Sequence, residues 1–209
     1  MTDTLGENRR LSSRHPLPAI RYHKELGKKY MINIRKTVSH GRIGEAVVTA
    51  KCWMHGIPAH NTNGLRANFA GSDLIVDTAD PRRKLLVQVK SGYARASQVY
   101  FTQATGVEDL EVAKFKADFV VFVNIDEKVG QQHAHDGKLQ FDHFSFFVVP
   151  VDDANRLFRD AVRREFERPK KDGGVRSLSG LAVYATPGTM EPYRDAWQLL
   201  RSVPHSGGI

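Results

Sequence analysis

Two nearly continuous apolar runs constrain the fold of this chain more than any other feature of its sequence. They occupy residues 117–125 (ADFVVFVNI) and 144–151 (FSFFVVPV) and are rich in Val and Phe. Each run has the length of a β-strand, and a strand without a polar face needs other elements on both sides of its sheet. The runs therefore predict a central sheet that is covered on both faces.

The rest of the chain supplies the covering elements. Helical spacing predicts a first core helix from an N-cap at Ser39 to a stop at Gly56, with an apolar stripe of Ile43, Ala46, Val47, Ala50 and Met54. Further strands are expected at residues 57–62, 73–77, 85–91 and 181–185. Helices are expected after a cap at Asp152 or Asp153, and after Thr189 with a stripe of Tyr193, Ala196, Trp197 and Leu200. This order predicts an α/β fold with a central mixed β-sheet flanked by helices, in one domain at residues 39–203.

Positive charge is concentrated at the N-terminal end. The formal net charge is +8, and residues 1–44 alone hold ten Lys and Arg against three Asp and Glu. A basic segment on a neutral body is typical of a protein that binds a polyanion, most often nucleic acid. The alternative is a solubilising tail. We expect residues 1–38 to form a basic, partly flexible extension, in which residues 21–38 are either helical or partly ordered, and residues 204–209 to form a flexible tail.

The sequence predicts a soluble, cytoplasmic protein. No apolar run approaches the roughly 18–20 residues that cross a bilayer, and the polar N-terminus has no apolar signal stretch behind it. The single cysteine, Cys52, cannot form an internal disulfide and excludes a cysteine-based zinc site. His133, His135 and His143 have no Cys or Glu at helical spacing beside them, so we expect no metal site there.

Polar residues are embedded in two adjacent predicted strands. In the strand at residues 85–91, alternation places Gln88 and Lys90 on one face. If residues 79–82 form the turn, the numbers of opposite residues add up to 161, so Asp73 lies across from Gln88. Directly opposed side chains sit roughly 5 Å apart. A carboxylate, an amide oxygen and an ammonium group are therefore expected to converge.

This set contains the groups that phosphodiester hydrolysis needs. A hard cation such as Mg²⁺ (or Mn²⁺) takes oxygen ligands, here the Asp73 carboxylate, the Gln88 carbonyl and the backbone carbonyl of Val89. Such an ion polarises a phosphoryl oxygen and offsets the negative charge that develops in the reaction. Lys90 is expected to position and deprotonate the attacking water or to stabilise the charged transition state. Glu45 is expected to orient water or to hold a second ion.

These residues resemble the motif of the PD-(D/E)XK nuclease superfamily, which includes restriction endonucleases, Holliday-junction resolvases and some homing endonucleases. The matching positions, within residues 39–125, are Gly44-Glu45, Ser72-Asp73 and Gln88-Val89-Lys90. The resemblance implies a restriction endonuclease-like fold and a metal-dependent endonuclease that hydrolyses phosphodiester bonds, with DNA as substrate. It also implies catalytic roles for Glu45, Asp73, Gln88 and Lys90, with Asp73, Gln88 and Glu45 as metal ligands.

Two positions depart from the usual motif. Ser72 stands where proline is usual, and Gln88 stands where an acid is usual, which removes one negative ligand. Several nuclease branches also carry glutamine there. The alternative function is a catalytically inactive nucleic-acid-binding module on a nuclease fold. A third interpretation is an α/β domain in which the motif is accidental.

Each residue of the motif also has a structural explanation. Glu45 suits the start of a helix, and the apolar stripe of that helix makes it solvent-facing. Asp73 suits the entry of a strand, and Gln88 and Lys90 suit the exposed polar face of an edge strand. These explanations predict exposed side chains with no special surroundings.

Basic residues outside the motif are the candidates for contact with DNA phosphates. They are Lys28, Lys29, Arg35, Lys36 and Arg42 in the N-terminal basic segment, and Arg66 and Arg95 in loops that bracket the predicted site. Exposed cations of this kind also occur on surfaces that bind nothing. Cutting both strands of a duplex with one site per chain favours a two-fold homodimer.

Overall fold

The computed structural model describes residues 26–62, 71–95, 97–126, 140–169, 173–174 and 177–201, and for residues 26–39 it describes the helical backbone alone. The chain divides into two compact units, Met1–Arg35 and Lys36–Ile209. In the first unit the described residues, 26–35, are helical.

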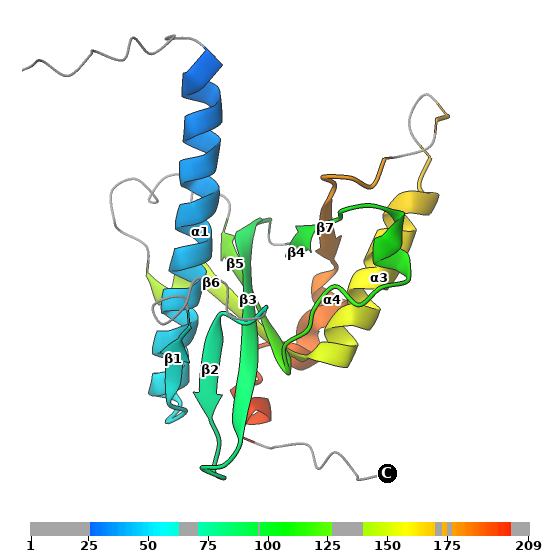
Figure 1. Cartoon of the computed structure of the whole chain (residues 1–209). Helices are drawn as coiled ribbons and strands as arrows, with labels where there is room; N and C mark the ends of the chain where they lie inside the picture. The colour runs from blue at the N-terminus through cyan, green and yellow to red at the C-terminus, as the bar shows by residue number, and fades with distance from the viewer. Residues whose placement is uncertain are drawn as a thin grey trace, which may run out of the picture. The chain divides into compact units, whose positions relative to one another are not determined.

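A five-stranded mixed sheet forms the centre of the second unit (Figure 1). Its strands lie in the order β1-β2-β3-β5-β6, and β3 and β5 are parallel whereas every other neighbouring pair is antiparallel. The bounds are β1 (Ala59–Asn61), β2 (Leu74–Asp77), β3 (Lys84–Ala94), β5 (Phe119–Asp126) and β6 (Phe144–Pro150). The predicted α/β class with a central mixed sheet is confirmed.

Separate apolar layers cover the two faces of this sheet. One face packs against helix α1 (Leu26–Met54) and the 3₁₀ turn η4 (Trp197–Leu200), and the other packs against helix α3 (Val151–Glu167). The second face also carries a two-stranded sheet that the sequence did not predict as a unit, β4 (Val99–Gln103) paired with β7 (Ala182–Ala185). In β5, all residues except Asp126 are buried. The inference of coverage on both faces from the apolar runs is therefore confirmed.

Helix α1 differs from its prediction in its start and in its buried face. The helix continues through Ser39, which is not an N-cap, and it ends as predicted before Gly56, whose φ is +67°. Its buried residues are Gly44, Val48 and Cys52, whereas Ala46 and Met54 of the predicted stripe are exposed. The apolar stripe predicted from the sequence does not coincide with this buried face, because the residue of α1 that packs closest to the sheet is a glycine.

Two helix boundaries near the C-terminal end were also predicted wrongly. Helix α3 begins directly after Pro150, so Asp152 and Asp153 lie in its first turn, where negative charge is favourable, rather than capping it. The predicted helix after Thr189 is replaced by α4 (Pro187–Met190) and the 3₁₀ turns η3 (Glu191–Tyr193) and η4. Arg194 leaves the helical path to form a β-bridge with Phe147 of β6, and Asp195 takes a φ of 47°, which Asp tolerates better than most residues.

The approach of α1 to β3 is close enough to require a glycine at position 44. A Cβ atom built on Gly44 would lie 2.6 Å from both Cβ and Oγ of Ser91, whereas one built on Gly41 meets nothing within 4 Å. Ser91 Oγ also donates a hydrogen bond of 2.8 Å to the backbone carbonyl of His40 in α1. This contact fixes the distance between the helix and the central strand.

We predict opposite effects for two alanine substitutions in the same helix. Gly44→Ala lowers the free energy of unfolding by about 1–3 kcal/mol, because the added methyl group overpacks the contact with Ser91. Gly41→Ala raises it by roughly 0.5–1 kcal/mol, because alanine is the better helix former and space is open. Urea unfolding followed by circular dichroism measures both values. Equal changes in the two variants would show that the close approach is not a constraint.

Candidate active site

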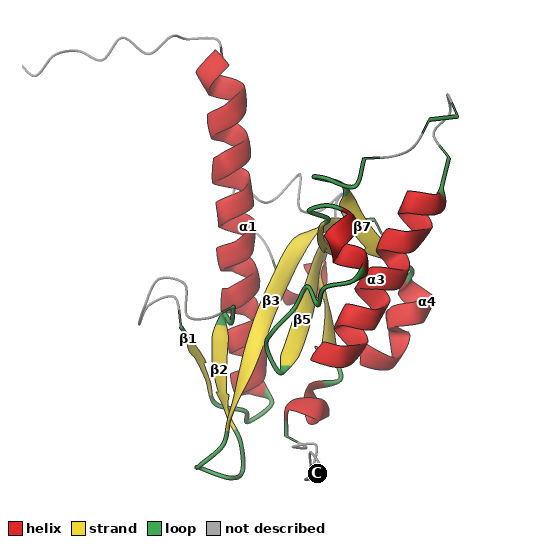
Figure 2. Ribbon diagram, turned by 45° about the vertical axis from the view of Figure 1, so that its right-hand side comes forward, coloured by secondary structure: helices red, strands yellow, loops and turns green. Residues whose placement is uncertain are grey.

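Strand β3 continues past the start of its neighbour β2 (Figure 2). Leu74 faces Val87 and Asp77 faces Lys84, so the register predicted from the turn length is confirmed. Asp73, one residue before β2, donates its backbone N–H to the carbonyl of Val87 at 2.9 Å. Its carboxylate Oδ2 accepts a hydrogen bond of 2.7 Å from the backbone N–H of Val89. Asp73 thus ends the described β2–β3 ladder at the level of Gln88, and we call this place the notch.

Gln88 lies in the notch with an unsatisfied polar atom. Val87 and Val89 on either side of it are buried in the apolar layer under α1, so the Gln88 side chain points to the opposite face of β3. Its Oε1 is buried and has no hydrogen-bond partner within the described part of the chain. A buried acceptor without a partner costs about 1–3 kcal/mol. The notch is therefore suited to a ligand that binds an amide oxygen.

Lys90 lies two residues further along β3 on the same face as Gln88, and it is partly buried. Burial lowers its pKa below the usual value, the carboxylates of Asp73 and Glu45 oppose that shift, and the ammonium group of Lys114 adds to it. The charged groups of Asp73, Glu45 and Lys114 therefore lie within electrostatic range of the Lys90 ammonium group. The exposed edge strand that the structural explanation requires is not observed, since β3 is the middle strand of the sheet.

Helix α1 brings Glu45 to the same region. Glu45 directly follows Gly44, the residue that packs on Ser91 of β3, so it borders the buried face of α1. Its Oε2 accepts a hydrogen bond of 2.8 Å from Nδ2 of Asn61, the last residue of β1. Glu45 is half-buried, whereas the apolar stripe placed it on the solvent face, because that stripe does not mark the buried face of α1.

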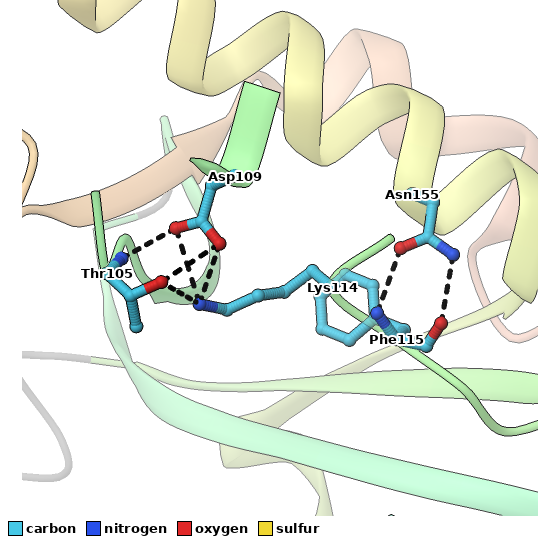
Figure 3. A network of polar contacts seen from close by, with 5 residues as sticks. All are labelled: Thr105, Asp109, Lys114, Phe115 and Asn155. Atoms are coloured by element: carbon cyan, nitrogen blue, oxygen red, sulfur yellow. Dashed lines mark hydrogen bonds and ion pairs between the residues drawn. The ribbon is translucent and has the colours of Figure 1, made fainter. Parts of the chain in front are cut away.

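Two residues near the notch were not found from the sequence. Asn61 orients Glu45, and Lys114 is the cation that acts on Lys90. Lys114 Nζ lies 3.0 Å from Oδ1 of Asp109 and 3.2 Å from Oγ1 of Thr105 (Figure 3). The sequence carries no signal for either residue, because one ends a three-residue strand and the other lies in a loop.

Asp109 anchors the loop that carries Lys114. Its side chain is buried, and it accepts hydrogen bonds from the backbone N–H and the hydroxyl of Thr105 as well as from Lys114. Next to Lys114, the side-chain amide of Asn155 in α3 bonds to both backbone groups of Phe115 (Figure 3). This network attaches the loop between β4 and β5 to α3 and holds Lys114 in place.

Of the predicted phosphate-binding residues, the structure describes the side chains of Arg42 and Arg95. Arg42 is exposed on α1, and Arg95 is exposed at the end of β3. The side chains of Lys28, Lys29, Arg35 and Lys36, and all of Arg66, His133 and His135, lie outside the described residues. His143 is described, and its Nδ1 accepts a hydrogen bond from the backbone N–H of Gln140.

The groups of the notch are compatible with one hard cation. No three residues among the described His, Cys, Asp and Glu lie together in a way that could hold a metal ion. The notch instead combines the Asp73 carboxylate with the buried amide oxygen of Gln88, and the Glu45 carboxylate lies within electrostatic range of Lys90. Oxygen donors of this kind are the ligands that Mg²⁺ and Mn²⁺ prefer. The unsatisfied Oε1 of Gln88 is an atom that such an ion would bind.

Comparison with known proteins gives one structural likeness. No family model and no curated protein matches the chain. Among solved structures, the chain is similar to the bacterial homing endonuclease I-Ssp6803I, with 17% sequence identity and a TM-score of 0.41. The match covers 78% of this chain and 92% of that one. A search of the described residues for membrane-spanning helices found none of sufficient length and apolarity.

We predict that the Asp109 network contributes stability that depends on pH. Burial raises the pKa of Asp109, but the hydrogen bonds from Thr105 and the hydrogen bond and charge of Lys114 lower it to a net value below its usual one. The contribution is therefore complete above the unfolded-state pKa of 3.8 and is lost as the pH falls through the lower folded-state value. Asp109→Asn should lower the free energy of unfolding at neutral pH by about 1–3 kcal/mol.

The measurement is urea unfolding of wild type and Asp109→Asn between pH 7 and pH 3. The difference in stability should be constant near neutrality and shrink below pH 3.8. Asp160→Asn, on the exposed side of α3, is the matched control and should change stability by less than about 0.5 kcal/mol. A pH-independent difference for Asp109→Asn would contradict the assignment of the ionised pair.

Proposed function

We propose that this chain is a metal-dependent endonuclease that hydrolyses phosphodiester bonds, with DNA as its substrate. The observation that carries the proposal is the buried, unsatisfied Oε1 of Gln88 in a notch shared with Asp73 and Lys90. If the residues of the motif had only a structural role, Oε1 of Gln88 would be buried without any group to bind it. A bound cation supplies one.

In this proposal Asp73, Gln88 and Glu45 hold Mg²⁺ or Mn²⁺. The ion, when bound, polarises a phosphoryl oxygen and offsets the negative charge that develops on the phosphorus centre. The hydrogen bond from the Val89 amide to Asp73 Oδ2 restricts the rotation of that carboxylate. The bond from Asn61 does the same for Glu45. The ligands are therefore oriented before the ion arrives, which favours binding.

Lys90 and Glu45 have different roles at the substrate. Lys90 lies two residues from Gln88 on the same face of β3, and its Nζ donates a hydrogen bond to a phosphate oxygen, where negative charge increases in the transition state. Glu45 accepts a hydrogen bond from the attacking water and thereby directs its oxygen toward phosphorus. Lys114, held by Asp109, adds positive charge beside Lys90.

DNA is the proposed partner because of the charge distribution along the chain. The N-terminal basic segment, which includes Lys28, Lys29, Arg35, Lys36 and Arg42, holds most of the net charge of +8. Contacts from such a segment to phosphates give affinity that is independent of base sequence. With one notch in the described part of the chain, cleavage of both strands favours two copies, and we propose a homodimer on the DNA.

One observation favours a second function, a nucleic-acid-binding module without catalysis. Gln88 replaces an acid, and the described residues contain no group of three acidic or histidine ligands. A module of this kind keeps affinity for DNA but shows no cleavage with any divalent cation. The experiment that tests the nuclease therefore also separates it from this rival.

We predict that purified protein nicks supercoiled plasmid with Mg²⁺ or Mn²⁺ and not with EDTA. Asp73→Asn keeps the acceptor for Val89 but loses the charge, and Lys90→Met keeps the packing but loses the amine. Each should lower the cleavage rate by about a hundredfold or more. The matched controls are Asp77→Asn and Lys84→Met, which break an exposed ion pair of 2.7 Å at the other end of the same two strands and should leave the rate unchanged.

Two outcomes would contradict the nuclease. The first is DNA binding by the wild type with no cleavage in either metal, which supports the binding module. The second is wild-type cleavage by Asp73→Asn or Lys90→Met with folding intact by circular dichroism, which removes the notch from the reaction.

A further inference from the structure

A cavity lies further along the central strands, beyond Lys90 of β3. It has a volume of about 260 Å³ and lies among the ends of β3 and β5, the start of β6 and the segment around Arg194. This volume is slightly below the roughly 300–1,000 Å³ of sites that hold drug-sized ligands. The cavity therefore suits a ligand of one or two rings.

The floor of the cavity is fixed by a buried amide. Asn124 of β5 is 8% exposed, its Oδ1 accepts a hydrogen bond of 3.0 Å from the backbone N–H of Tyr100, and its Nδ2 donates one of 2.9 Å to the carbonyl of Gln98. The Tyr100 ring also packs directly on Gly92 of β3, where a Cβ atom would come within 2.4 Å of the ring. These contacts hold β4 against β3 and β5, so the cavity is formed without a ligand.

One wall of the cavity presents a flat cation. The guanidinium carbon of Arg194 lies 5.0 Å from the centre of the Phe147 ring, and its Nε donates to Glu191 at 3.0 Å. The ring and this bond together orient the guanidinium group. A guanidinium plane held in this way stacks on nucleobases and donates hydrogen bonds to their edges.

The other lining groups make the cavity polar but balanced in charge. The lining holds two arginines, Arg95 and Arg194, and two aspartates, Asp126 and Asp142. His143 adds an imidazole ring and Ser145 adds a hydroxyl group. A phosphate group favours an excess of positive charge, whereas a nucleobase is neutral and carries both donors and acceptors. The balance of the lining therefore favours a base over a phosphate.

The cavity lies on the same face of the sheet as the notch. Lys90 pairs with Phe122 and Gly92 pairs with Asn124, so the line of side chains that begins at Lys90 continues to the cavity floor. The notch lies at the level of Gln88, four residues before Gly92, so about 13 Å of strand lies between the notch and the cavity floor. The Tyr100 ring packs on Gly92 between them. A nucleic acid strand bound at the notch thus runs within reach of the cavity.

We infer that this cavity binds one unstacked nucleobase of the nucleic acid, with Arg194 as the residue on which the base stacks. The choice of a nucleobase rests on the proposed nuclease function, but the binding site itself is independent of cleavage. It gives the protein a contact with a base beside the cleaved phosphate, in addition to contacts with the backbone.

The test is titration of isotope-labelled protein with the four common nucleosides and, separately, with inorganic phosphate, followed by amide chemical shifts. At least one nucleoside should shift the amides of residues 94–98, 124–126 and 142–147 and leave those of β2 unchanged. Arg194→Lys keeps the charge but loses the plane, and it should weaken this binding by about tenfold or more. Arg82→Lys, at the exposed turn before β3, is the matched control and should bind as the wild type does.

Several results would overturn the inference. They are the absence of shifts at the cavity with every nucleoside, equal binding by Arg194→Lys and wild type, or shifts at the same amides with phosphate alone. The test is also separate from that of the nuclease. Lys90→Met should bind the nucleoside as the wild type does, so loss of cleavage does not remove the site. A protein that cuts DNA but binds no nucleoside lacks the site and keeps the proposed function.

Discussion

The partial burial of Gln88 and Lys90 on the central strand is the constraint to which the rest of the site responds. A polar pair on β3, with α1 on one side of the sheet and α3 on the other, loses hydration that must be replaced. Lys90 recovers part of it from two carboxylates, which oppose the lowering of its pKa by burial. Gln88 does not recover its lost hydration, because its Oε1 has no hydrogen-bond partner in the described structure. The molecule keeps an unfavourable group at this position, and such groups cluster where ligands bind.

The geometry of the notch depends on contacts that lie just outside it. The glycine at position 44 allows α1 to approach Ser91, and this approach carries Glu45 to the edge of the sheet. Asn61 then orients Glu45 from β1, and the backbone of β3 orients Asp73. Each carboxylate is thus held by a different element. Substitutions that loosen α1 or the β1–β2 pair should impair the site without touching the proposed ligands.

The parts of this arrangement that follow from regular geometry could be predicted from the sequence. The apolar runs indicated the buried strands β5 and β6, and the length of the turn at residues 79–82 gave the register that places Asp73 beside Gln88. The parts that depend on tertiary contact could not. The buried face of α1 runs through a glycine, which hydrophobic periodicity ignores, and the segment after Thr189 breaks because Arg194 pairs with β6. Lys114 reaches Lys90 from a loop whose path the Asp109 network determines.

Metal binding at Gln88 is the most direct test of the account, measured by calorimetric titration of Mn²⁺ into wild type, Gln88→Ala and Gln88→Glu. A neutral amide oxygen binds a hard cation less strongly than a carboxylate does. The account predicts modest affinity in the wild type, weaker binding in Gln88→Ala and tighter binding in Gln88→Glu. Equal affinities in all three proteins, or no binding in any, would show that the buried oxygen of Gln88 is not a metal ligand.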